Sequence, residues 1–217
     1  PYRAERIAAL LAHRKGLTPD DFQRMQADTY SLHAQTLLPV LLRHVDAVDD
    51  EAREALELLR TWDYDAARDS AAAAIFQVWF LQLAPAIVGD DLGPQLLDNY
   101  QGRYSFITRF LLATLGSDPL AWCDNTTTPV AETCRQAVTS AFQRAVGIVQ
   151  ARLGKDVRAW KWGDLHPAVF PHQGLDGVAL LRPILNRSIA NGGDWSTVNV
   201  GAVAADHQFE QRAVPGY

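Results

Sequence analysis

Apolar residues recur at helical spacing from the first residues of the chain onward. Ile7, Leu10 and Leu11 lie on one face of a predicted helix near the start. Thr18 is expected to cap a second helix, because threonine is a favoured N-cap and is followed by proline and two acids. The helical pattern then continues until Pro39, which is expected to bend or interrupt the helix.

The same spacing predicts helices through the middle of the chain. Asp49 is expected to open one whose apolar stripe comprises Ala52, Ala55, Leu56, Leu59 and Trp62. The apolar run 71–88 contains two glutamines and a proline, so it falls short of an unbroken membrane span and is interpreted as a buried helix. Shorter helical pieces are predicted at 92–99 and 103–115. The longest helix is expected to start at Thr128-Pro129 and to end at Gly154.

The pattern changes after residue 154. Tryptophan, histidine, proline and glycine are frequent up to about residue 177, which is typical of an ordered but irregular segment. Alternating positions then predict strands at 196–203 and 207–211. The sequence therefore divides into a helical part, residues 1–154, and an irregular part with strands, residues 155–217, and its predicted class is α+β.

Composition and charge narrow the possible functions. The chain has 217 residues, of which 48% are hydrophobic, and this is enough for a buried core. Its net charge of -5, without a block of basic residues, argues against nucleic acid as a partner, because phosphate neutralisation needs a clustered basic surface. No cofactor is predicted.

Two cysteines, Cys123 and Cys134, lie eleven positions apart. Two are too few for a tetrahedral zinc site, and the spacing differs from a Cys-x-x-Cys redox motif. A disulfide closing this loop is favoured over two reduced, buried thiols, and it would imply an oxidising compartment.

Several short motifs along the chain resemble those of one known family. A glycine turn leads into an alternating segment at Asn191–Gly201, and four other motifs fall in the same order and at similar distances as in that family: Tyr2–Ile7, Trp62-Asp63, Trp122–Asp124 and Trp160–His166. The chain thereby resembles the penicillin acylase family, N-terminal-nucleophile hydrolases that cleave acyl amides. The resemblance covers nearly the whole chain.

The resemblance implies a fold, an activity and a partner. The fold would be part of an αββα sandwich, represented by its helical excursion and by the return of residues 155–217 into the sheet. The activity would be cleavage of an N-acyl amide, such as an N-acyl-homoserine lactone, a β-lactam side chain or a lipopeptide. Because the chain begins with Pro1, the N-terminal serine nucleophile would come from another chain of the same processed precursor, in a bacterial periplasm or secreted. This chain alone should then be inactive.

Arg3 is the candidate catalytic residue. It lies on the same helical face as the first apolar positions, and a cation at a helix N-terminus opposes the helix macrodipole. A buried arginine there needs a carboxylate, a carbonyl or a substrate as its partner. The alternative is a structural arginine, which either extends its head to water or pairs within the fold. The resemblance favours the first alternative, because the family has an active-site arginine at the start of a matching helix, shortly after an oxyanion-hole asparagine.

Three other residues are expected to support the site without touching the substrate: Asp194, Asn199 and His166. Asp194 would hold backbone amides of its own turn, and Asn199 would extend towards the active site from the predicted strand. Asp164, His166 and His172 match no standard metal spacing, so no metal site is predicted.

The alternative is a non-enzymatic, all-helical binding module that ends in a hairpin. Under that alternative the strand predicted at 196–203 would pair within this chain, whereas in the enzyme it would enter a sheet built largely by another chain.

Overall fold

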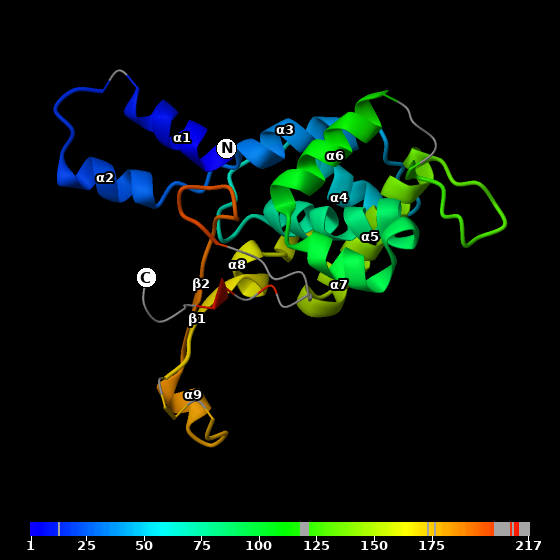
Figure 1. Ribbon diagram of the computed structural model, residues 1–217. Helices are drawn as coiled ribbons and strands as arrows, with labels where there is room; N and C mark the ends of the chain where they lie inside the picture. The colour runs from blue at the N-terminus through cyan, green and yellow to red at the C-terminus, as the bar shows by residue number, and fades with distance from the viewer. Residues whose placement is uncertain are drawn as a thin grey trace.

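The computed structural model describes residues 1–12, 14–117, 122–172, 174–175, 177–201, 209 and 211–212. Helices form most of it, with a small sheet at one side, so the α+β class holds at this coarse level (Figure 1). The helices are α1 (Tyr2–Leu11), α2 (Pro19–Gln26), α3 (Leu32–Leu41), α4 (Asp50–Arg60), α5 (Ala71–Gln101), α6 (Tyr104–Ser117), α7 (Cys134–Leu153), η2 (Val157–Ala159), α8 (Trp162–Leu165) and α9 (Arg182–Leu185).

Helix α5 is the centre of the core. It packs along α7 and also contacts α4, α6 and α8. Trp79 of α5 meets Phe142 of α7 edge to face at 4.8 Å between ring centroids, and both side chains are fully buried. Burial of each such ring stabilises the fold by about 1.5–3 kcal/mol. The aromatic residues of this helix are therefore core residues, as their helical spacing predicts.

The prediction of a buried helix at 71–88 is confirmed. Among the described residues α5 alone is long and apolar enough to cross a membrane, and most of its apolar stretch is buried by the rest of the chain. The helix continues past Pro85 and breaks at Gly93, whose φ of 65° is non-helical. This break separates off the piece predicted at 92–99.

Three helix predictions are wrong in detail. The helix expected from Thr18 to Pro39 is two helices, α2 and α3, and Pro39 lies inside α3 without ending it. Helix α7 starts at Cys134 rather than at Thr128, and α5 is longer than α7. Thr133 caps α7 and forms a reciprocal capping box with Gln136. The segment before it stays irregular because side chains bind its backbone: Asp124 accepts from Glu132 N at 3.0 Å, and Asn125 accepts from Thr127 N at 3.0 Å. Such local bonds compete with helix formation.

The predicted strand at 196–203 is also wrong over its described part. Residues 195–199 form turns and bends, because the Asp194 side chain binds the backbone immediately after it. Residues 202–203, and most of the predicted strand 207–211, lie outside the described residues.

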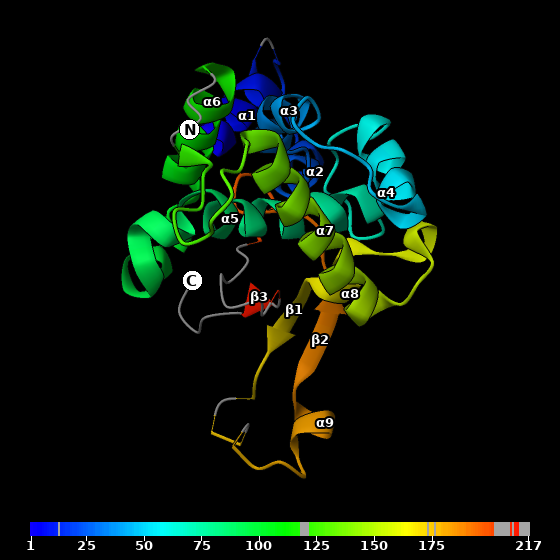
Figure 2. The same cartoon turned by 90° about the vertical axis from the view of Figure 1, so that its right-hand side faces the viewer.

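The small sheet forms elsewhere. Strand β1 (Pro167–Phe170) pairs antiparallel with β2 (Arg187–Ala190) and parallel with β3 (Gln211–Arg212), in the order β2-β1-β3. The β1–β2 hairpin projects away from the helices and carries α9 at its far end (Figure 2). Its two strands were not predicted, because segments of only four residues are too short to show a clear alternation.

Candidate functional site

The segment Asn191–Gly201, here called the Asp194 turn, is bound by several elements that lie far from it in the sequence. The Asp194 carboxylate is buried and accepts five hydrogen bonds. Oδ1 accepts from Ser196 N at 2.6 Å, Ser196 Oγ at 2.7 Å and Thr197 N at 3.1 Å. Oδ2 accepts from Ser31 Oγ at 2.6 Å and from Gln77 Nε2 at 2.8 Å. Asp194 therefore shapes its own turn and ties it to α3 and α5, the structural role expected of it.

Backbone bonds complete the attachment of this turn. Gly193 N donates to Ala66 O at 2.7 Å, and Trp162 Nε1 donates to Gly193 O at 2.8 Å. Gly193 has a φ of 82°, and a Cβ there would lie 2.0 Å from Asn199 O, so only glycine fits. The turn is thus held from several sides before any contribution from α1.

Arg3 binds the Asp194 turn through two carbonyl oxygens. Its Nε donates to Thr197 O at 2.9 Å and its Nη2 to Trp195 O at 2.6 Å. Arg6, one turn later, forms a bidentate pair with Asp28 at 2.9 and 2.6 Å, and Asn199 N donates to Asp28 O at 2.9 Å. Helix α1 is therefore fixed by polar contacts, although none of its residues is buried.

The partners of Arg3 all lie within this chain as far as the structure describes it. Arg3 is partly buried with carbonyl partners rather than extended into water, and it forms no ion pair with a carboxylate in the described part of the chain. Two carbonyl dipoles position the guanidinium but do not neutralise it. The positive charge is thus available to a polar group that approaches the first turn of α1. The apolar face predicted for α1 is not buried in the described chain, because Ile7 and Leu11 are exposed and Leu10 is only partly buried.

A buried histidine that the sequence did not single out lies behind Trp195. His33 is fully buried, with ring centroids 5.0 Å from Trp195 and 4.7 Å from Phe80. Its Nε2 lies 3.0 Å from Thr108 Oγ1, whose own proton goes to Tyr104 O, so Nε2 is the donor. Burial lowers the pKa of His33 to about 4, against a smaller opposing effect of the Asp194 charge. His33 is therefore neutral near pH 7.

His166 supports the other end of the turn. Its ring stacks on Trp162 at 4.5 Å, and its Nδ1 lies 2.6 Å from Phe209 O, to which it donates. Burial is also the main cause that lowers the pKa of His166. Its Nε2 faces Gly201, where a Cβ would lie only 2.3 Å away. His166 is thus close to the last residue of the Asp194 turn, at a position where a side chain would not fit.

The other predicted candidates are not gathered around Arg3. Asn199 donates from Nδ2 to Asn191 Oδ1 at 3.3 Å, so its amide closes the turn rather than extending from a strand. Asp164 and His172 are exposed while His166 is buried. No group of three His, Cys, Asp or Glu side chains with metal-binding geometry occurs in the described residues.

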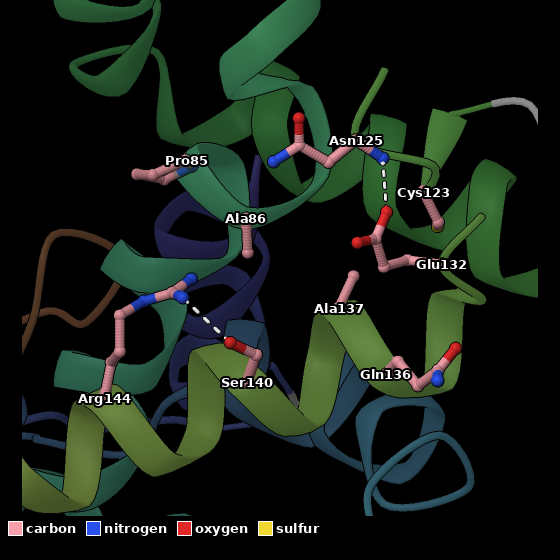
Figure 3. Close-up of a pocket in the computed structure, with 9 residues that line it drawn as sticks. All are labelled: Pro85, Ala86, Cys123, Asn125, Glu132, Gln136, Ala137, Ser140 and Arg144. Carbon is pink, nitrogen blue, oxygen red and sulfur yellow. Dashed lines mark hydrogen bonds between the residues drawn. The ribbon is translucent and has the colours of Figure 1, made fainter. Parts of the chain in front are cut away.

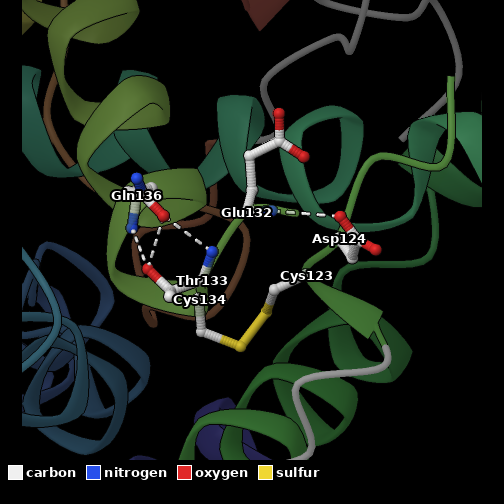
Figure 4. The surroundings of a disulfide bond; sticks show 6 residues. All are labelled: Cys123, Asp124, Glu132, Thr133, Cys134 and Gln136. Atoms are coloured by element: carbon white, nitrogen blue, oxygen red, sulfur yellow. Dashed lines mark hydrogen bonds between the residues drawn. A yellow bond between two sulfur atoms is a disulfide. The ribbon is translucent and has the colours of Figure 1, made fainter. Parts of the chain in front are cut away.

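The predicted disulfide between Cys123 and Cys134 is present, and it joins the loop before α7 to the first residue of that helix (Figure 4). Beside it lies a pocket of about 360 Å³ between α5, this loop and α7 (Figure 3). Arg144 points into the pocket and donates to Ser140 Oγ at 2.9 Å. None of the predicted site residues except Cys123 lines it.

Comparison with known proteins identifies the family. The sequence profile described as penicillin amidase matches residues 1–217, the whole chain. The chain belongs to this family.

Curated relatives of this penicillin amidase family member include several named acyl-homoserine lactone acylase QuiP. The protein from Pseudomonas aeruginosa is 29% identical over 99% of this chain, and this match covers 29% of the relative. Those from Pseudomonas syringae pv. tomato and Pseudomonas putida are 29% and 28% identical over 99% and 97% of this chain, and each match covers 28% of the relative. The chain thus spans less than a third of the length of these relatives.

Three residues of this family member's site region were missed: Ser31, His33 and Gln77. Two had a usable signal. Gln77 interrupts an apolar run, and a polar side chain in a buried helix needs a hydrogen-bond partner. Ser31 is the N-cap of α3 and is of a favoured type for that position. His33 gave no signal, because its burial depends on residues from four separate elements.

Proposed function

We propose that this chain is part of a larger amide hydrolase that acts on N-acyl compounds, with N-acyl-homoserine lactones as the first class to test. The single observation that carries the proposal is the Arg3 guanidinium, which is held by Trp195 O and Thr197 O and forms no ion pair among the described residues. Family membership and the names of the relatives add to it. In such an enzyme the strands of this chain would join an αββα sandwich completed by the rest of the precursor.

The proposed reaction uses a nucleophile from outside this chain. An N-terminal serine hydroxyl attacks the acyl carbonyl, and its proton passes to the free α-amino group and then to the leaving amine. The product is an acyl-serine ester, which water hydrolyses to the carboxylic acid. Backbone amides and an asparagine preceding Pro1 would hold the oxyanion, and Arg3 would orient that site or a polar group of the substrate.

The proposed setting is the periplasm or the exterior of a bacterium. The Cys123–Cys134 disulfide supports it, because such bonds persist in oxidising compartments. The rival binding module was also expected to end in a hairpin, so the sheet of the described chain does not distinguish the two functions.

The test uses the full-length, processed protein. An N-acyl-homoserine lactone, a β-lactam with an acyl side chain and a lipopeptide are supplied separately, and the released primary amine is measured. The proposal expects amine release from at least one substrate and a new N-terminal serine in the mass spectrum. A processed protein that releases amine from none of them would favour the binding module.

Arg3 is tested in the same assay. Arg3→Ala should lower kcat/KM by at least about tenfold, equivalent to about 1.4 kcal/mol of transition-state stabilisation. Arg3→Lys should recover only part of this, because an ammonium cannot reproduce the planar fork that binds two carbonyls. Arg60→Ala, at an exposed arginine paired with Glu57, is the control. Parental turnover by processed Arg3→Ala would make Arg3 a structural residue only.

A further inference from the structure

The β1–β2 hairpin, residues 167–190, is the most exposed apolar element of the described chain. It projects from the end of α8, and both views show it clear of the helices (Figures 1 and 2). Six of the fifteen exposed large hydrophobic side chains lie on this short segment. These are Phe170, Leu175, Val178, Leu180, Ile184 and Ile189, of which Leu180 is 83% and Ile184 64% exposed.

The register places apolar side chains together on one face of the hairpin. Ala168 lies opposite Ile189, and Phe170 lies opposite Arg187, so Phe170 and Ile189 are diagonal neighbours on the same face. Both are about half exposed. This face and the tip that carries α9 therefore form one apolar surface open to solvent.

The hairpin also has an open edge. In the described chain β2 pairs only with β1, so it is the edge strand of the sheet, and all four of its residues are exposed. An uncovered edge strand presents unpaired N–H and C=O groups, to which a further strand can be added. The exposed apolar face and the open edge together suit a partner that covers the face and pairs with the edge.

We propose that the hairpin docks against the part of the same precursor that lies outside residues 1–217. That part would add a strand along β2 and cover the tip with an apolar surface. The inference rests on the proposed function, in which this chain is one piece of a longer acylase. The matched relatives support it, because this chain covers only 29% of the Pseudomonas aeruginosa protein and most of such a protein is available to cover the hairpin.

The direct test places a photo-reactive benzophenone side chain at Leu180 in the full-length protein. After irradiation, mass spectrometry should find Leu180 joined to a peptide of the same precursor from outside residues 1–217. The same probe at Val48, which is 50% exposed on the helical part, sets the background. A product of twice the mass, joining two hairpins, would overturn the inference, as would a Leu180 probe that forms no product above background.

Variants give a second measurement. Leu180→Asp and Ile189→Asp should each lower the Tm of the full-length protein by more than about 4 °C, because a carboxylate would enter an apolar contact. Val48→Asp should leave the Tm nearly unchanged, and Leu180→Met should remain close to the parent. Parental Tm values for both aspartate variants would contradict docking.

The outcomes also distinguish this inference from the proposed function. A parent protein that hydrolyses amides but cross-links only between copies would retain the function and overturn the inference. An inactive parent protein whose Leu180 cross-links to the rest of the precursor would retain the docking and overturn the function.

Discussion

Replacement of Asp194 tests how far one buried carboxylate determines the site. In Asp194→Ala, three buried N–H groups lose their acceptor: those of Ser196 and Thr197 and the side-chain amide of Gln77. Each unsatisfied buried donor costs about 1–3 kcal/mol, so the free energy of unfolding should fall by about 3–9 kcal/mol. For a domain of this size, each kcal/mol lowers the Tm by about 2–4 °C.

Asp194→Asn separates hydrogen bonding from charge. The two backbone donors, at Ser196 and Thr197, cannot rotate, so the carbonyl oxygen of the new amide must face them. Its NH₂ group must then face Gln77, where a donor meets a donor. Rotation of the Gln77 amide by half a turn relieves this, so we expect a smaller loss of about 1–3 kcal/mol. Gln77→Glu in the same protein exchanges the amide and the carboxylate, and should recover part of the loss.

The assay is thermal unfolding of the processed enzyme, followed by circular dichroism, with kcat/KM measured on the same samples. Asp98→Asn, at an exposed position of α5, is the matched control. Because Arg3 binds two carbonyls of the Asp194 turn, activity should fall along with stability. If Asp194→Ala kept the parental Tm and activity, the turn would not depend on its buried carboxylate and the reasoning would fail.

Three further predictions concern a buried histidine, a packed glycine and the disulfide. His33 has a pKa of about 4 in the fold against a usual value near 6.5, so the unfolded chain binds a proton first as the pH falls. The free energy of unfolding should therefore be fully present above about pH 6.5 and should fall by about 3 kcal/mol towards pH 4. Urea titrations at several pH values should show a smaller fall for His33→Gln. Gly201→Ala should cost about 1–3 kcal/mol in thermal unfolding, because its Cβ would collide with the buried His166 ring, and an unchanged Tm would contradict this packing. Thiol titration of the denatured, unreduced protein should find neither Cys123 nor Cys134 free, and two titratable thiols would contradict the disulfide.

The elements that depend on local chemistry were predictable from the sequence. Thr18 caps α2 as expected, with its side chain bound to the backbone of Asp21, because an N-cap needs only residues within one turn. The buried run at 71–88 was also predictable, since a long apolar stretch needs cover from every side. The family followed from short motifs. The start of α7 was missed, because bonds of Asp124 and Asn125 hold the preceding segment out of a helix.

The site was predictable only in part, because its geometry comes from contacts between distant residues. Arg3 and Asp194 could be singled out, but the sequence did not indicate that one binds the carbonyls of the turn that the other shapes. The expected strand that would carry Asn199 is wrong for the same reason: alternation favoured a strand, and one buried carboxylate with two backbone donors made a turn.

The bond between Arg3 and Thr197 joins residues 194 positions apart, and this separation has a consequence for the order of events during synthesis. Helix α1 leaves the ribosome before its carbonyl partners, yet it has no buried side chain to hold it in place. At about 5–20 residues per second, its carbonyl partners follow many seconds later. Until then the first turn of α1 is without the anchor that fixes its guanidinium. Any chemistry that requires Arg3 in its final position must therefore wait until the chain has been made through Thr197. The length of chain between Arg3 and Thr197 sets the minimum delay before that chemistry can begin.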